Sequence, residues 1–129
     1  MAQPDIIELT GPSSNLKTAP DYYDSAAEED SAVVKAAPGV LYGFSGYNND
    51  ATGGALSYIQ VFDATSLPAN ATAVTKSIIV PVYAGQPFAF DAGKYGIPFS
   101  TGIVIAASST DITLTVKTDT EFLFGVSYK

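Results

Sequence analysis

The sequence predicts an all-β fold, an antiparallel β-sandwich or jelly roll of about seven to eight strands. Short runs rich in β-branched and aromatic residues recur at close spacing from Val40 to the end of the sequence. The segments between them are rich in glycine, proline, asparagine and aspartate, which favour turns. No segment between these runs carries a convincing helical pattern. We therefore predict one β-sandwich domain over residues 38–129, preceded by an extended acidic N-terminal arm over residues 1–37.

The N-terminal arm differs from the domain in its charge and composition. Residues 1–35 contain seven carboxylates and two lysines and are rich in turn-forming residues, which is typical of an extended segment. The acids do not follow the spacing of an EF-hand, so no calcium site is predicted. The stretch from Ser25 to Ala37 allows a short helix, with Ser25 as its cap and Glu28 three residues later. The apolar residues of the arm are the predicted contacts with a partner protein: Ile6, Ile7, Leu9, Tyr22 and Tyr23.

Seven runs after the arm are assigned as strands. In chain order they read "VLYGFSGY", "LSYIQVFD", "SIIVPVY", "PFAF", "GIVIAAS", "ITLTVK" and "FLFGVSY". The first four are assigned from their apolar content and from the turn-forming residues on both sides. Pro81 interrupts the third run, and because proline cannot donate a ladder hydrogen bond, this strand is placed at a sheet edge or at a bulge.

The fifth run follows a glycine-rich stretch, "DAGKYGIPFSTG", which raises the question of a phosphate-binding loop. Such a loop needs its glycines to close onto the N-terminus of a helix, whereas these glycines precede a β-branched run. Lys94 also stands before the last two glycines, against the order of a P-loop. We therefore predict that Gly93 and Gly96 form a turn. Ile103 and Ile105 are predicted to lie in the core.

The last two runs alternate between residues of different character, as half-buried strands do. In "ITLTVK", Ile112, Leu114 and Val116 alternate with threonine and lysine. In the final run one face carries Phe122, Phe124, Val126 and Tyr128. Both runs are therefore predicted to pack one face against the core.

The composition excludes several classes of function. The sequence contains no cysteine, histidine or arginine, and so lacks the usual disulfide partners, zinc ligands, proton shuttles and phosphate clamps. Its formal net charge of −7 argues against nucleic-acid binding. No run has the length of a membrane-spanning helix, and the first residues carry no signal-peptide pattern. We therefore expect a protein made in the cytoplasm, with no nucleic-acid or membrane partner.

No catalytic residue, metal ligand or cofactor is predicted. The carboxylates that could act in pairs all lie in or beside turns, where aspartate normally caps its own backbone: Asp50, Asp63, Asp91, Asp111, Asp119 and Glu121. Serine and threonine have no imidazole to activate them. Lys76 and Ser77 are neighbours on one strand and would face opposite ways. The residues therefore favour a non-enzymatic protein.

Aromatic residues are the remaining signal, with eight tyrosines and seven phenylalanines. Exposed rings on one rigid face can stack against sugars, and five tyrosines are candidates for such a platform: Tyr42, Tyr47, Tyr58, Tyr83 and Tyr95. The loops "GYNND" and "KYG" combine a ring with polar groups, which gives four candidate ligand or interface residues: Tyr47, Asn48, Asn49 and Tyr95. The favoured alternative is that the tyrosines line the core or a subunit interface.

Three segments resemble a group of small structural proteins of tailed bacteriophages. They are "PGVLYGFSGYN", "YIQVFDATSLPA" and "IIVPVYAGQPFAFDAGKYGIPFSTGIVIAAS". In that group a strand with a "Q-V-x-D-A" type of ending leads to a proline loop, and a "G-x-x-F-x-T-G-I" segment opens a buried strand. The resemblance covers roughly residues 38–108 and the β-rich end, and its motifs carry no catalytic residues.

The resemblance implies a virion component: a head decoration or cement protein, or a subunit associated with the neck, tail or fibre. We expect a non-enzymatic capsid decoration or cement subunit that binds across capsomer joints and stabilises the head. Its expected partners are the major capsid protein or another virion protein and further copies of itself, with a homotrimer favoured by the local threefold positions of capsids. The alternative is a carbohydrate- or receptor-binding β-sandwich of a tail, neck or fibre.

Overall fold

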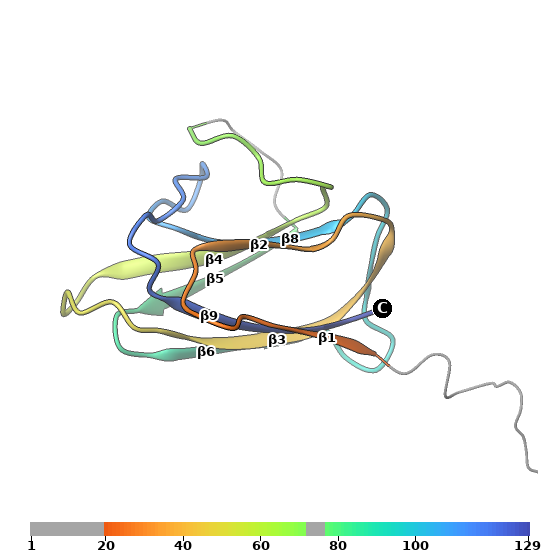
Figure 1. The fold of residues 1–129 in the computed structure, drawn as a ribbon, viewed down its shortest axis with the longest axis horizontal. Helices are drawn as coiled ribbons and strands as arrows, with labels where there is room; N and C mark the ends of the chain where they lie inside the picture. Colours follow the sequence, from red (N-terminus) through yellow and green to blue (C-terminus); the bar gives the residue numbers. More distant parts are fainter. Residues whose placement is uncertain (1–19, 72–76) are drawn as a thin grey trace, which may run out of the picture.

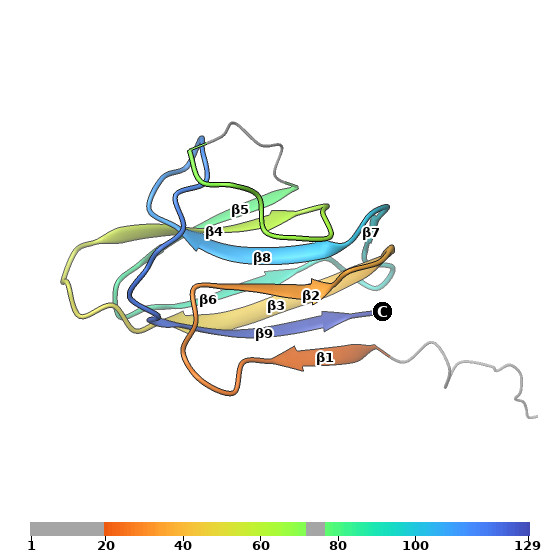
Figure 2. The same ribbon diagram turned by 45° about the horizontal axis from the view of Figure 1, so that its top comes forward.

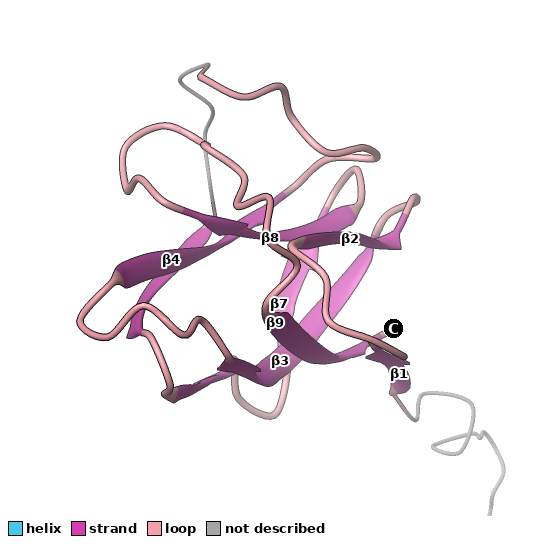
Figure 3. Cartoon of the chain, turned by 60° about the vertical axis from the view of Figure 1, so that its left-hand side comes forward, coloured by secondary structure: helices cyan, strands magenta, loops and turns pink. Residues whose placement is uncertain are grey.

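A computed structural model of the protein describes residues 20–71 and 77–129. These residues form nine strands in two antiparallel sheets (Figure 1). The sheets stack face to face as two layers, which Figure 3 shows from one end. The predicted β-sandwich is confirmed, with nine strands where about seven to eight were expected. Within the described ranges there is no helix that is long and apolar enough to span a membrane.

The first sheet has five strands in the order β1-β9-β3-β6, and β7 pairs with the start of β3. Their bounds are β1 Asp21–Asp24, β3 Gly39–Asn48, β6 Pro87–Asp91, β7 Ile97–Phe99 and β9 Phe122–Tyr128. The second sheet has four strands in the order β2-β8-β4-β5. Their bounds are β2 Ser31–Lys35, β4 Leu56–Phe62, β5 Ile78–Tyr83 and β8 Ile103–Ser108. The first and last strands lie side by side, as Figure 2 shows for β1 and β9.

Apolar side chains from both sheets fill the space between the two layers. The ring centroids of Phe44 and Phe88 lie 6.2 Å apart. The ring centroid of Phe124 lies 6.0 Å from that of Phe88, and the ring centroid of Phe122 lies 6.1 Å from that of Phe124. Tilted and stacked rings at these distances stabilise a core beyond the burial of area alone. From the second sheet, Ile105 belongs to the same cluster and is 1% exposed.

The last strand, β9, follows the predicted alternation. Phe122, Phe124 and Val126 are at most 1% exposed, whereas Leu123 between them is 39% exposed. Tyr128 is partly buried and packs against the same core. The predicted inward face of this strand is therefore confirmed.

Pro81 lies in β5, an edge strand of the second sheet, as predicted. Opposite residues of an antiparallel ladder alternate between hydrogen-bonded and non-hydrogen-bonded pairs. Ala84 and Ala55 form a hydrogen-bonded pair, in which the N–H of Ala84 donates to the carbonyl of Ala55 at 2.8 Å. The register places Pro81 opposite Tyr58, and this is a non-hydrogen-bonded pair, which needs no N–H from the proline. The proline therefore removes a donor only from the free edge, where this discourages pairing with a further strand.

The predicted helix and the predicted boundary of the arm are wrong. Asp21–Asp24 pairs with β9 and Ser31–Lys35 pairs with β8, so both segments belong to the sandwich. The hydroxyl of Ser25 caps no helix but accepts a hydrogen bond from the N–H of Phe124 at 2.9 Å. Val34 is 8% exposed in the core, and such cross-strand contacts override a weak local helix preference. The remaining predicted contacts of the arm lie outside the described residues: Ile6, Ile7 and Leu9.

The predicted strand "ITLTVK" is also wrong. This segment makes one isolated bridge, through Val116, and otherwise forms a loop. The hydroxyl of Thr110 donates to the carbonyl of Thr113 at 2.6 Å, and side-chain bonds of this kind compete with a sheet ladder. Leu114 is fully buried in a second apolar cluster against the outer face of the second sheet, while Ile112 is 76% exposed.

Gly93 and Gly96 form the predicted turn, with φ angles of 86° and 71°. We expect alanine at either position to destabilise the protein, because a left-handed backbone costs an L-residue about 1–2 kcal/mol. Gly96→Ala should cost more, since a Cβ there would lie 2.7 Å from the carbonyl oxygen of Leu41, whereas nothing lies within 4 Å of one at Gly93. Thermal unfolding measures the difference, and equal losses would contradict the close approach at Gly96.

Ile103 and Ile105 lie in the core as predicted, at 0% and 1% exposure. We expect Ile105→Ala to lower the free energy of unfolding by about 2–5 kcal/mol, because it removes buried methyl groups and leaves a cavity. Ile79→Ala is the matched control, since Ile79 is 41% exposed on β5 and its truncation should cost far less. Urea unfolding compares the two variants, and a similar loss in both would show that Ile105 is not a core residue.

Candidate functional site

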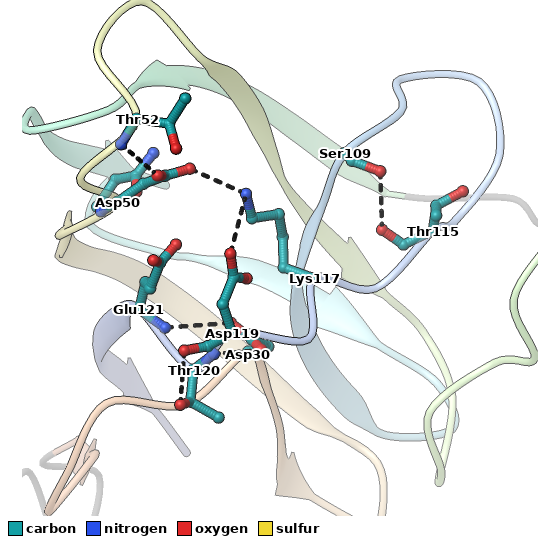
Figure 4. Close-up of polar contacts among 10 residues, drawn as sticks. Asp30, Asp50, Thr52, Ser109, Thr115, Lys117, Asp119, Thr120 and Glu121 are labelled. Atoms are coloured by element: carbon teal, nitrogen blue, oxygen red, sulfur yellow. Dashed lines mark hydrogen bonds and ion pairs between the residues drawn. The ribbon is translucent and has the colours of Figure 1, made fainter.

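Four charged side chains meet where the loop after β3 contacts the segment before β9 (Figure 4). The Nζ of Lys117 lies 3.0 Å from Oδ2 of Asp50 and 4.0 Å from Oδ2 of Asp119. Glu121 completes this carboxylate–lysine cluster, in which oxygens of the three carboxylates lie within 4.8 Å of one another. Asp50 is 8% exposed, so its ion pair with Lys117 joins the two loops in a partly shielded position.

Contacts within the cluster shift the pKa values of Asp50, Lys117 and Glu121. The N–H of Thr52 donates to Asp50 at 2.8 Å and, together with Lys117, holds the pKa of the Asp50 carboxyl below its usual value. Burial acts to lower the pKa of Lys117, but the hydrogen bond to Asp50 and the nearby carboxylates raise it. Burial and a hydrogen bond with Asp119 raise the pKa of the Glu121 carboxyl. The pair of Asp50 and Lys117 is therefore held in its charged form.

The carboxylate–lysine cluster has the features of a structural contact. Three carboxylates at this spacing offer oxygen ligands to a cation, but Lys117 already supplies positive charge among them. Thr120, between two of them, has a φ of 52°, which is unusual for a β-branched residue, and its N–H donates to Asp30 at 2.7 Å. The sequence flagged the carboxylates as turn residues but not Lys117, which lies 67 residues from Asp50.

Asp63 at the end of β4 binds the loop that leads into β8. Its Oδ1 accepts hydrogen bonds from the N–H of Thr101 at 2.7 Å and of Gly102 at 3.2 Å. Its Oδ2 accepts from both the N–H and the hydroxyl of Ser100 at 3.0 Å. Burial acts to raise the pKa of the Asp63 carboxyl, but these backbone hydrogen bonds outweigh it and lower the pKa to about 2.

The five candidate tyrosines do not form one platform. Tyr42 and Tyr47 lie on β3 in the first sheet, whereas Tyr58 and Tyr83 lie on β4 and β5 in the second sheet. Tyr95 is 84% exposed in the loop between β6 and β7. The predicted pair of Tyr47 and Tyr95 is therefore split between opposite ends of β3, which pairs with β7 at its start and reaches Tyr47 near its end.

The other predicted ligand residues are engaged in contacts of the fold. Asn48 is fully buried, and its Oδ1 accepts a hydrogen bond from the N–H of Asp50 at 3.0 Å. The side-chain amide of Asn49 donates to Glu28 at 2.6 Å. The hydroxyl of Tyr47 donates to a backbone carbonyl, that of Gly85, at 3.2 Å. These groups hold loops in place, and Asn48 is not accessible to a ligand.

The two described tyrosines among the predicted partner contacts differ in exposure. Tyr23 packs against the core, and its hydroxyl donates to Glu29 at 2.5 Å. Burial and this hydrogen bond raise the pKa of Tyr23 to about 12. Tyr22 is 64% exposed on the opposite face of β1. Of this pair, Tyr22 is the side chain that remains accessible to a partner or ligand.

The outer face of the first sheet carries a groove that several strands build together. The register places four residues in one row across the sheet, one from each strand: Tyr22, Ser127, Gly43 and Asp91. Two adjoining hollows of about 260 Å³ and 530 Å³ lie here, and Tyr42 and Asp91 line both. We call these two hollows the outer groove. The sequence did not reveal it, because the pairing of distant strands decides which side chains share a row.

The free edge of the second sheet exposes apolar side chains. Ile79 and Tyr83 on β5 are 41% and 57% exposed, and Pro81 between them is also exposed. Alternation along the strand places these three residues on one face. We call them the β5 row. Large apolar side chains that stand together at a sheet edge are typical of a contact with another protein.

No known protein family, curated protein or solved structure matches this chain.

Asp63 predicts a specific dependence of stability on pH. Because its pKa is lowered from 3.8 to about 2 on folding, the carboxylate contributes stability that is present above pH 4 and is lost as the pH falls toward 2. Asp63→Asn should be less stable at pH 7 and should lose less further stability on acidification. Asp111→Asn, which changes a carboxylate in an exposed turn, is the control and should follow the unsubstituted chain. Urea unfolding at several pH values measures this, and parallel curves for Asp63→Asn and the unsubstituted chain would contradict the assignment.

Proposed function

We propose that this chain is a non-enzymatic structural protein of a bacteriophage virion, a capsid decoration or cement subunit that binds across capsomer joints and stabilises the head. It is made in the host cytoplasm, assembles as a homotrimer, and contacts the major capsid protein or another virion protein. The observation that carries the proposal is the β5 row, with Ile79 41% and Tyr83 57% exposed at a free sheet edge. Covering an apolar row of this kind with a protein partner is favourable, because it removes apolar surface from water.

The engagement of the carboxylates supports a non-enzymatic role. Asp50 is paired with Lys117, and Asp63 binds backbone N–H groups. Asp91 accepts a hydrogen bond from the N–H of Gly93 at 2.8 Å in its own turn. General acid–base catalysis needs a carboxyl group directed at a substrate, with a pKa near the working pH. The lowered pKa values of Asp50 and Asp63 do not suit that task.

The proposal also rests on the resemblance to phage structural proteins, whose two motifs meet in space in this chain. Asp63 closes the "QVFDA" segment, and Thr101 and Gly102 belong to the "GIPFSTGI" segment. The carboxylate of Asp63 binds the N–H groups of both. One contact that joins the end of β4 to the start of β8 therefore gives both motifs a common role in building the sandwich.

The β5 row provides the test in assembled particles. A phage that encodes the chain with Ile79→Ser and Tyr83→Ser should incorporate it at least fivefold less, because the apolar contact is lost while the core is unchanged. Quantitative mass spectrometry of purified virions, relative to the major capsid protein, measures the occupancy. Tyr95→Ser is the matched control, since Tyr95 is 84% exposed in a loop of the other sheet, and it should leave occupancy unchanged.

Two outcomes of this experiment, and one of a separate mass measurement, would count against the proposal. If the unsubstituted chain is absent from purified virions, the structural role is wrong. If the double variant reaches full occupancy, the β5 row is not the contact. Light scattering of the full 13.4 kDa chain tests the homotrimer, and a monomeric mass at every concentration would contradict it.

A further inference from the structure

The outer groove presents two tyrosine rings beside a floor that has almost no side chains. The smaller hollow is floored by residues with small side chains: Gly43, Ser45, Gly125 and Ser127. A Cβ at Gly125 would overlap the ring of Tyr22, lying 2.9 Å from its Cζ. The Tyr22 ring therefore lies across bare backbone, and it is still 64% exposed. Tyr42 supplies the second ring and lines both hollows.

Polar groups surround these rings, and several of their atoms form no hydrogen bond within the described residues. One oxygen of Asp91 accepts a hydrogen bond from Gly93, and the other makes none within residues 20–71 and 77–129. In the same part of the chain, the hydroxyls of Ser127 and Tyr22 form no hydrogen bond. Lys94 lines the larger hollow and is the cation among its lining residues. The groove therefore offers donors and acceptors next to apolar rings.

This combination suits a sugar ring. The C–H face of a pyranose stacks on an aromatic ring, while its hydroxyls bond to carboxylate and hydroxyl groups at the edge. Tyr22 and Asp91 stand on the outer two of four adjacent strands, which places their backbones about 14 Å apart across the sheet. The row is therefore long enough for a short oligosaccharide instead of a single sugar.

The charge of the protein favours neutral sugars over anionic ones. The chain has a net charge of −7, and the groove contains the carboxylate of Asp91 with Lys94 as the opposing charge. An anionic glycan, such as a sialylated one, would meet a repulsive field. A neutral oligosaccharide would meet none.

We propose that the outer groove is a binding site for short neutral oligosaccharides. Tyr22 and Tyr42 stack against the sugar rings, and Asp91 and Ser127 accept and donate hydrogen bonds with their hydroxyls. The site lies on a different sheet from the β5 row. It therefore does not rest on the proposed structural role, and a virion subunit with both surfaces would bind a protein through one sheet and glycans through the other.

The test uses the full chain and two probes. A glycan array that carries neutral and sialylated glycans screens for binding, and maltotriose, cellotriose and chitotriose are titrated while backbone amide shifts are followed by NMR. We expect at least one neutral oligosaccharide to shift amides of β1, β9 and β3 around the groove, with weaker signals for sialylated glycans. Tyr22→Ala and Tyr42→Ala should each weaken binding at least tenfold. Tyr83→Ala is the control, because Tyr83 is 57% exposed on the other sheet, and it should change binding less than twofold.

A third variant keeps the test valid if the tyrosine variants fail to fold. Ser45→Leu fills the floor of the groove at an exposed position and leaves both rings in place, so it should also abolish binding. The proposal is overturned if neither the array nor the titrations detect a neutral glycan, or if binding persists in all three variants. Amide shifts in the groove that depend on protein concentration without sugar would likewise overturn it, since they would show a contact between copies of the chain.

Discussion

The apolar layer between the two sheets is the constraint on which the rest of the structure depends. The chain passes from one sheet to the other repeatedly, and each passage is fixed by side chains that pack into this layer. Phe44, Phe88 and Phe124 of the first sheet pack in one cluster with Ile59 and Ile105 of the second. Because a strand exposes alternate residues on its two faces, this packing also decides which side chains face outward.

Carboxylates fix the loops at the ends of this layer in a protein without disulfides. Asp30 binds the N–H of Thr120 at 2.7 Å, Asp63 binds the loop before β8, and Asp50 pairs with Lys117. Each of these contacts joins segments far apart in the chain, and each uses an acid that would otherwise be available for chemistry. The two surfaces proposed as contact sites lie outside this layer, the β5 row on one sheet and the outer groove on the other. The proposed protein contact and the proposed sugar site would therefore act independently.

Local sequence patterns by themselves determined much of the sandwich. Alternation in the last run placed Phe122 and Phe124 on the buried face, and breaker residues located the turn at Gly93. Proline chemistry placed the strand with Pro81 at an edge. The β-branched run around Ile105 was correctly assigned to the core. These features depend on the geometry of a few consecutive residues, which composition and spacing report directly.

Only the tertiary structure decided the features that depend on pairing between distant segments. Val34 lies in a strand and not in a helix because its neighbours in β2 pair with β8, and Leu114 is buried in a loop because hydroxyl groups replace the ladder there. The outer groove follows the same rule. Tyr22 shares a row with Asp91 because β9 and β3 lie between them in one register, and a shift of one residue would turn either side chain to the other face. The sequence contains all of these residues, but register is a property of strand pairs and cannot be predicted from any single strand.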